Sequence, residues 1–158
     1  MAAADDLIAF LAPKLGTEIH VGPWLAVDQG RIDAFAAATG DIQWIHTDPE
    51  RARHESPYGT TIAHGFLTLS LLPFLTEANA PGQFERNYPG MRLRVNYGLN
   101  RVRFPAPVKT GSRIRARTVL AALEPLGAAV QITYEITVEI EGEAKPACVV
   151  EQLFRLSP

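Results

Sequence analysis

Apolar residues recur at intervals of three and four in two stretches of the N-terminal half, residues 7–15 and 32–39. This spacing places the apolar side chains on one face of a helix, so it predicts two amphipathic helices. Asp28 precedes the second stretch at a plausible N-cap position, and Gly40 follows it where a C-cap glycine belongs. A third, short helix is expected to open at Asp48-Pro49.

The stretch from Ile62 to about Ala78 is apolar on nearly every side of a helical projection. A helix that is apolar all round is buried in the core of a protein. Pro73 has no backbone N–H and should kink or interrupt such a helix. We therefore expect a long buried helix with a break near Pro73.

After Met91 the period of the pattern changes to two, as along Val130–Ile140, where apolar and polar residues alternate. Such alternation predicts a half-buried antiparallel strand. Extended segments are expected at 91–104, 113–122, 130–140 and 146–156. Pro125 to Gly127 supplies the turn before the long strand. Successive strands with short turns predict a meander, so the fold class is α+β, with an antiparallel sheet packed around the buried helix. The pattern leaves the strand order open.

Composition narrows the class of protein. The chain has 158 residues, 47% of them hydrophobic and 20% charged, with a formal net charge of −2. We expect one domain spanning residues 1–158. The hydrophobic fraction and the low net charge disfavour a disordered chain. A disulfide scaffold is disfavoured because Cys148 is the single cysteine. A basic nucleic-acid binder is disfavoured because the chain has 15 Lys+Arg and 17 Asp+Glu. Neither a secretory signal nor a membrane span is recognisable, so a cytoplasmic location is expected.

Asp41 and His46 lie five positions apart, just after the second predicted helix and among apolar residues. An aspartate and a histidine that converge on one water can act as an acid–base pair. Asp41 can equally be a turn residue, and His46 can be a packed histidine. His64 can reach the same site, but capping or packing explains it at least as well, so we keep it outside the catalytic set. Gly65 stands near the start of the apolar helix, where an unpaired backbone N–H can bind a substrate oxygen.

Two motifs carry a family resemblance. Thr39-Gly40-Asp41 with His46, followed by Ala63-His64-Gly65, resembles the hydratase motif of the MaoC-like dehydratases. That family includes (R)-specific, or type-2, enoyl-CoA hydratases and nodulation-protein-N-like members. The segment from Asn96 to Val108, followed by Gly111, resembles a strand of the same family. The resemblance extends from about residue 15 to the end of the chain.

The resemblance implies a hot-dog fold, in which an antiparallel sheet wraps a long central helix, and a homodimer with an acyl-CoA site near the subunit interface. It implies that Asp41 and His46 hold a water molecule that adds to C3 of a trans-2-enoyl-CoA while C2 receives a proton. The product would be the (R)-3-hydroxyacyl-CoA. By the same resemblance, the Gly65 N–H polarises the thioester carbonyl. No cofactor is expected, because coenzyme A is part of the substrate. No metal is expected either, because the histidines lack ligand spacing and partner cysteines.

The motif departs from the common family pattern at two positions. Many members have Asn-Pro where this chain has Gln43-Trp44. Gln43 still offers an amide donor and acceptor, although its longer side chain changes the geometry. Trp44 and Tyr58 are further candidates for lining an acyl channel. Core packing is the competing explanation for both aromatic residues.

Several arginines could meet the phosphates of coenzyme A, because guanidinium groups bind phosphate in a bidentate manner. Arg101 and Arg103 are the candidates for such contacts. The row formed by Arg113, Arg115 and Arg117 is more typical of a solvated strand face. Cys148 is expected to be a buried, inert thiol.

Three functions remain open from the sequence. The first is (R)-specific hydration of enoyl-CoA, which the Asp41, His46 and Gly65 constellation favours. The second is a hot-dog acyl-CoA thioesterase. The third is a non-catalytic acyl-CoA-binding module, which the departure at Gln43 keeps open.

Overall fold

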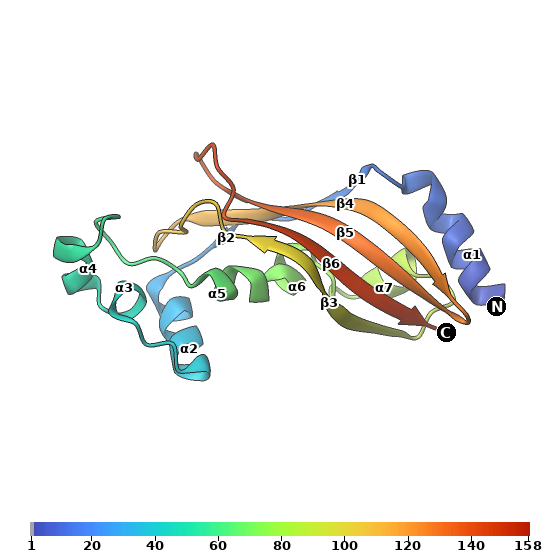
Figure 1. Ribbon diagram of the computed structural model, residues 1–158, viewed down its shortest axis with the longest axis horizontal. Coiled ribbons are helices and arrows are strands. Elements are labelled where there is room, and N and C mark those ends of the chain that lie inside the picture. The colour runs from blue at the N-terminus through green and yellow to red at the C-terminus, as the bar shows by residue number, and fades with distance from the viewer. Residues whose placement is uncertain (1) are drawn as a thin grey trace.

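The computed structural model describes residues 2–158, and a strongly curved antiparallel sheet dominates it (Figure 1). The order of the strands is β1-β4-β5-β6-β3, and β2 pairs with one end of β4. The strands are β1 (Glu18–Val21), β2 (Leu25–Ala26), β3 (Leu93–Arg103), β4 (Arg113–Leu126), β5 (Ala129–Ile140) and β6 (Cys148–Ser157). The three C-terminal strands form the predicted meander, and β3 joins the sheet beside β6, so it is an edge strand.

The helices lie against one face of the sheet and at its two ends (Figure 1). They are α1 (Ala2–Leu11), a 3-10 turn (Ala12–Lys14), α2 (Gln29–Thr39), α3 (Trp44–Thr47), α4 (Pro49–Glu55), α5 (Gly65–Ser70), α6 (Leu72–Leu75) and α7 (Gln83–Asn87). α5 and α6 run beneath the sheet, while α2, α3 and α4 gather beyond one end of it (Figure 1). The site described below lies where these two groups of helices meet.

The sequence signals for helix ends are confirmed. The Asp28 carboxylate accepts a hydrogen bond from the Arg31 N–H at the start of α2. Gly40 ends α2 in the left-handed conformation, with φ 79°, which a residue with a side chain rarely adopts. Asp48 caps α4 by accepting from the Arg51 N–H, and Pro49 is the first residue of that helix.

The alternating pattern of the strands places the core on the inner face of the sheet. On β4, Ile114, Ala116 and Leu120 are fully buried, while the arginines between them are more exposed. These residues and the buried side chains of β5, β6, α1, α5 and α6 form one hydrophobic cluster. The fold is therefore α+β with the hydrophobic core between the sheet and the helices, as predicted.

The expected long buried helix is divided and only partly buried. It begins at Gly65 rather than near Ile62, which instead bridges to Lys109, and it breaks at Leu71 between α5 and α6. Pro73 accounts for the break, because it has no N–H to donate to the carbonyl four residues earlier. The sheet covers one side only, so Phe66 and Phe74 keep 67% and 52% of their surface exposed. The prediction of burial on every side was wrong.

Other boundaries differ by a few residues. The strand β4 continues through Pro125 to Leu126, so the turn is formed by residues 127 and 128 rather than by 125–127. The first helix begins earlier than its apolar pattern indicated. β3 runs without a break through Gly98, although its register with β6 shifts between Asn96 and Gly98. Within residues 2–158, none of the helices is both long enough and apolar enough to cross a membrane.

Candidate active site

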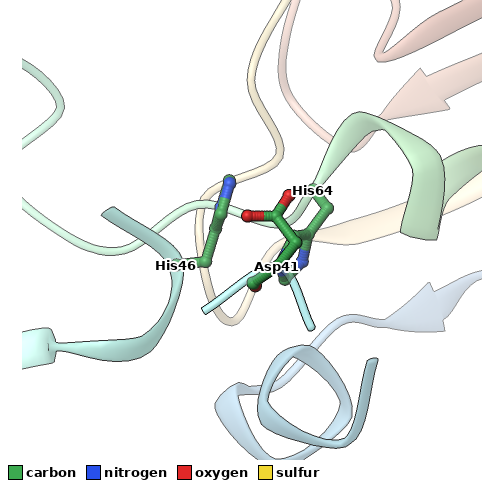
Figure 2. A group of neighbouring side chains, drawn as sticks. All are labelled: Asp41, His46 and His64. Atoms are coloured by element: carbon green, nitrogen blue, oxygen red, sulfur yellow. The ribbon is translucent and has the colours of Figure 1, made fainter. Parts of the chain in front are cut away.

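Asp41, His46 and His64 come together from three different segments (Figure 2). Asp41 follows the C-cap of α2, His46 is on α3, and His64 immediately precedes α5. One carboxylate oxygen and one nitrogen of each imidazole lie within 4.8 Å of one another. Figure 2 shows the Asp41 carboxylate beside the two imidazole rings. The structure thus brings together the predicted Asp–His pair and adds a second histidine to it.

His46 is held in one orientation by its surroundings. It is 9% exposed, and its Nδ1 lies 2.7 Å from the Ile62 carbonyl oxygen. A carbonyl only accepts, so Nδ1 carries the hydrogen, and in the neutral ring Nε2 is the atom with the free lone pair. The Gln29 side chain also donates a hydrogen bond to the His46 carbonyl, at 2.7 Å. His46 therefore presents a basic nitrogen in a fixed position.

His64 is 3% exposed and contacts both Asp41 and His46. Its Nε2 donates to the Asp41 carbonyl oxygen at 2.9 Å. Its ring stacks on the His46 ring with centroids 3.9 Å apart and an interplanar angle of 27°. Its Nδ1 is buried and has no hydrogen-bond partner among the described residues.

Asp41 is the exposed member of the group. Its backbone N–H is 3.4 Å from the Thr39 hydroxyl, and its carbonyl receives the hydrogen bond from His64. Within residues 2–158 its carboxylate makes neither a hydrogen bond nor a salt bridge with another side chain. The carboxylate oxygens are therefore available to a water molecule next to His46 (Figure 2).

Gly65 is the first residue of α5 and follows His64 directly. Its N–H donates no hydrogen bond to a backbone carbonyl of the described residues. The space that a side chain would take at Gly65 is filled by Phe104, since a Cβ there would lie 2.9 Å from the ring. A larger residue at this position would displace the Phe104 ring, which is a reason for glycine that the sequence pattern does not reveal.

Gln43, Trp44 and Tyr58, the other predicted residues near the motif, lie at the start of α3 and in the turn after α4. Gln43 is the exposed N-cap residue of α3, between Asp41 and His46 in the chain. Trp44 begins α3, and the Arg51 guanidinium covers its ring at 4.4 Å from the centroid. Tyr58 is 37% exposed in the turn that follows α4.

Arg101 and Arg103 lie near the end of β3 and line a surface pocket of about 570 Å³. Arg101 is 3.8 Å from a Glu151 oxygen, and its side chain is 81% exposed. Arg103 donates to the neighbouring Val102 carbonyl at 2.7 Å. Both guanidinium groups are accessible to an anion, but the pocket does not include any of Asp41, His46 and His64.

The other arginine row is a solvated face, as expected. Arg113 pairs with Glu141 at 2.9 Å, Arg115 with Glu139 at 2.7 Å, and Arg117 with Glu18 at 2.8 Å. The Glu18 contact raises the pKa of Arg117 above its ordinary value. Since these guanidinium groups already bind carboxylates, they are poor candidates for phosphate contacts.

Cys148 is completely buried. Burial raises the pKa of its thiol from 9.0 to about 11. A thiol that stays protonated at neutral pH is a weak nucleophile. The expectation of an inert cysteine agrees with this environment.

Two features of the site were not predicted from the sequence. His64 was kept outside the catalytic set, because capping or packing explained it at least as well. Its contact with Asp41 could not be foreseen, since the hydrogen bond joins residues 23 positions apart. Its position next to Gly65 was the one available signal. The second feature is that one carboxylate and two imidazoles now form a group that could hold a metal ion. The spacing of the histidines alone had pointed to no metal.

A second cavity, of about 350 Å³, lies between the inner face of the sheet and α7. The hydroxyl groups of Tyr88 and Tyr134, 2.9 Å apart, belong to residues of its wall. None of the predicted site residues lines this cavity. The group of Asp41, His46 and His64 therefore lies outside it, at the end of the sheet where α2 and α3 gather (Figure 1).

Comparisons with known proteins show which proteins this chain is similar to. The chain is 50% identical over 151 residues to 3-hydroxyacyl-thioester dehydratase Z of Mycobacterium tuberculosis, covering 95% of each chain. It is 50% identical over 141 residues to nodulation protein N of Rhizobium leguminosarum bv. viciae, covering 89% of this chain and 84% of that one.

Among solved structures, R-hydratase PhaJ1 from Pseudomonas aeruginosa in the unliganded form has the same fold. Its TM-score is 0.63 at 22% identity, over 88% of this chain and 83% of that one. The predicted hot-dog fold is therefore confirmed. Residues 11–142, which include Asp41, His46, His64 and Gly65, match the family described as MaoC like domain. The chain belongs to this family of MaoC-like dehydratases.

Proposed function

We propose that the protein hydrates trans-2-enoyl-CoA to (R)-3-hydroxyacyl-CoA and catalyses the reverse dehydration. One observation carries the proposal: the Asp41 carboxylate and the His46 imidazole lie within 4.8 Å of each other, and each is free to bind water. The 50% identity to a 3-hydroxyacyl-thioester dehydratase supports the substrate class.

The roles follow from the hydrogen bonds of the two side chains. With the His46 Nδ1–H bound to the Ile62 carbonyl, Nε2 accepts a hydrogen from the water, and Asp41 accepts the other. The water oxygen forms a bond to C3, and the C2=C3 electron pair moves toward C2 and the thioester carbonyl. The base that removed the water proton returns it to C2. One water molecule is consumed, and both carbons become saturated.

Gly65 is the candidate for the group that stabilises the negative charge on the thioester oxygen. Its N–H follows His64 directly and makes no backbone hydrogen bond among residues 2–158. A backbone N–H placed at a developing oxyanion can contribute about 3–4 kcal/mol of transition-state stabilisation. Gln43, Trp44 and Tyr58 are proposed to border the acyl group, and Arg101 and Arg103 to contact the phosphates of coenzyme A.

The experiment is to incubate the purified protein with crotonyl-CoA and with longer trans-2-enoyl-CoA substrates. Loss of enoyl absorbance measures hydration, and chiral chromatography identifies the product. We expect the (R)-3-hydroxyacyl-CoA. Release of free thiol from saturated acyl-CoA without hydration would instead indicate a thioesterase. Binding of acyl-CoA without turnover at every chain length would indicate a binding module.

We propose that the reaction requires neither a cofactor nor a metal, because water, two side chains and one backbone N–H account for every step. The group of Asp41, His46 and His64 makes this worth testing, since it could hold a cation. Activity should survive exhaustive dialysis against EDTA and should not rise when zinc or magnesium is restored. A coenzyme A substrate also favours a cytoplasmic location, which cell fractionation can check.

We further propose a homodimer. The edge strand β3 exposes an apolar side chain at every second position, namely Leu93, Val95, Tyr97 and Leu99, which are 41–55% exposed. An exposed apolar edge strand is a surface on which a second strand pairs. Phe66 continues the apolar surface, because its ring contacts Phe104 just after β3. Sedimentation equilibrium should give twice the chain mass of 17.3 kDa.

A further inference from the structure

His64 touches both members of the proposed acid–base pair without being part of it. Its Nε2–H donates to the Asp41 carbonyl oxygen at 2.9 Å, and its ring lies on the His46 ring at 3.9 Å. With 3% of its surface exposed, it is the most deeply buried of the three residues. A buried side chain in contact with both groups is suited to fixing their relative position.

The hydrogen bond from His64 anchors a segment that has few other restraints. Asp41 itself is exposed, and the following Ile42 is 71% exposed. The other bonds of this segment are local, such as Ile42 N–H to the Gly40 carbonyl at 3.0 Å. Among residues 2–158, His64 supplies the one side-chain hydrogen bond that ties Asp41 to a distant part of the chain.

Stacking on His64 adds to the restraint that the Ile62 carbonyl places on the His46 ring. The bond from Nδ1 to the Ile62 carbonyl fixes the ring within its own plane, and His64 covers one face of that ring. Phe35 supports His64 in turn, with ring centroids 4.9 Å apart. The His46 ring is thereby held in one orientation in the group that includes the Asp41 carboxylate.

We propose that His64 is a positioning residue for hydration, which acts through Asp41 by the Nε2 hydrogen bond and through His46 by stacking. This inference rests on the proposed function of the Asp41–His46 pair. A displacement of about 1 Å in a catalytic group can lower the rate by roughly 100-fold. Loss of the anchor should therefore lower kcat while KM changes little.

The test compares His64→Gln with His64→Met, two side chains of similar length. Both lack the ring, but glutamine keeps an N–H donor for the Asp41 carbonyl. We expect His64→Met to lower kcat about 10- to 100-fold, and His64→Gln to recover a large part of that loss. In an Asp41→Asn background the two substitutions should give the same kcat to within about twofold, because the group that the bond positions has been removed.

Several measurements separate this inference from its alternatives. His54→Met is the matched control, since His54 is exposed on α4 and its Nε2 pairs with Glu50 at 3.2 Å. Thermal melting confirms folding, and ¹⁵N-edited spectra of the imidazoles show whether His46 loses its fixed environment in His64→Met. Equal kcat for His64→Met and wild type, or an unchanged Gln–Met difference in the Asp41→Asn background, would overturn the proposal. An inactive wild type would refute the function instead, and the His46 spectra would still test the positioning role.

Discussion

At the scale of single residues, the site is defined by which hydrogen-bonding atoms are already engaged. His46 uses Nδ1 on a backbone carbonyl, His64 uses Nε2 on another, and the Asp41 carboxylate remains free. The sequence motif allowed Asp41, His46 and Gly65 to be predicted as candidates, because these residue types match the chemistry. The motif could not assign a role to His64, since its hydrogen bond to Asp41 depends on how the two segments pack.

Gly65→Ala tests the packing of the residue whose N–H is proposed to bind the thioester oxygen. The added Cβ would lie 2.9 Å from the Phe104 ring, so the ring must move. We expect kcat on crotonyl-CoA to fall about 10- to 100-fold through the displaced geometry. Gly30→Ala is the control, because a Cβ there meets its nearest atom at an ordinary 3.6 Å. Equal activity of the two variants would argue against a role for Gly65.

The raised pKa of the Cys148 thiol predicts that the free energy of unfolding depends on pH. Burial raises the pKa of its thiol to about 11 in the folded protein, above the ordinary value of 9.0. The unfolded chain therefore loses this proton at lower pH than the folded protein, so the stabilisation present below pH 9 is lost as the pH approaches 11. Urea unfolding should show a steeper loss of stability in this range for wild type than for Cys148→Ala. Parallel curves would contradict the assigned environment.

At the scale of elements, alternation and capping residues predicted most of the fold. The strands of the C-terminal half and the caps at Asp28, Gly40 and Asp48 follow from local chemistry. The apolar helix was predicted less well, because a count of apolar residues does not reveal which of them the sheet covers. Leu72 and Leu75 are buried against the sheet, whereas Phe66 and Phe74 point away from the core.

Leu75→Ala tests which side of α6 carries the core. Leu75 is completely buried, so its truncation should lower the free energy of unfolding by about 2–5 kcal/mol. Leu126→Ala makes the same chemical change at a side chain that is 41% exposed, and we expect a loss below about 1 kcal/mol. Urea unfolding at one protein concentration compares the two. Equal losses would contradict the described packing.

At the scale of the whole molecule, the sheet and α5–α6 enclose one core and leave an apolar edge. The order of the strands was left open by the sequence, because alternation identifies the faces of a strand but not its neighbours. The pairing of β3 with β6 places the stripe of Leu93, Val95, Tyr97 and Leu99 at the edge of the sheet. That exposed stripe is the main structural support for the proposed homodimer.

Tyr97→Asp tests the dimer at the centre of this stripe. A charge among apolar contacts loses its hydration when a second copy binds, so the variant should sediment as a monomer. Leu126→Asp places the same charge at another exposed apolar residue, at the end of β4, and should leave the dimer intact. A wild-type protein that is monomeric, or a Tyr97→Asp variant with the mass of a dimer, would contradict the proposed interface.

The most direct test of the central claim is the rate of crotonyl-CoA hydration by Asp41→Asn and His46→Gln. Each substitution removes one member of the acid–base pair, so we predict a fall in kcat of about 100- to 10,000-fold. Asp48→Asn and His54→Gln change the same residue types at exposed positions of α4 and its cap, and should retain the wild-type rate. Activity of Asp41→Asn or His46→Gln that stays within a few-fold of wild type would contradict the account.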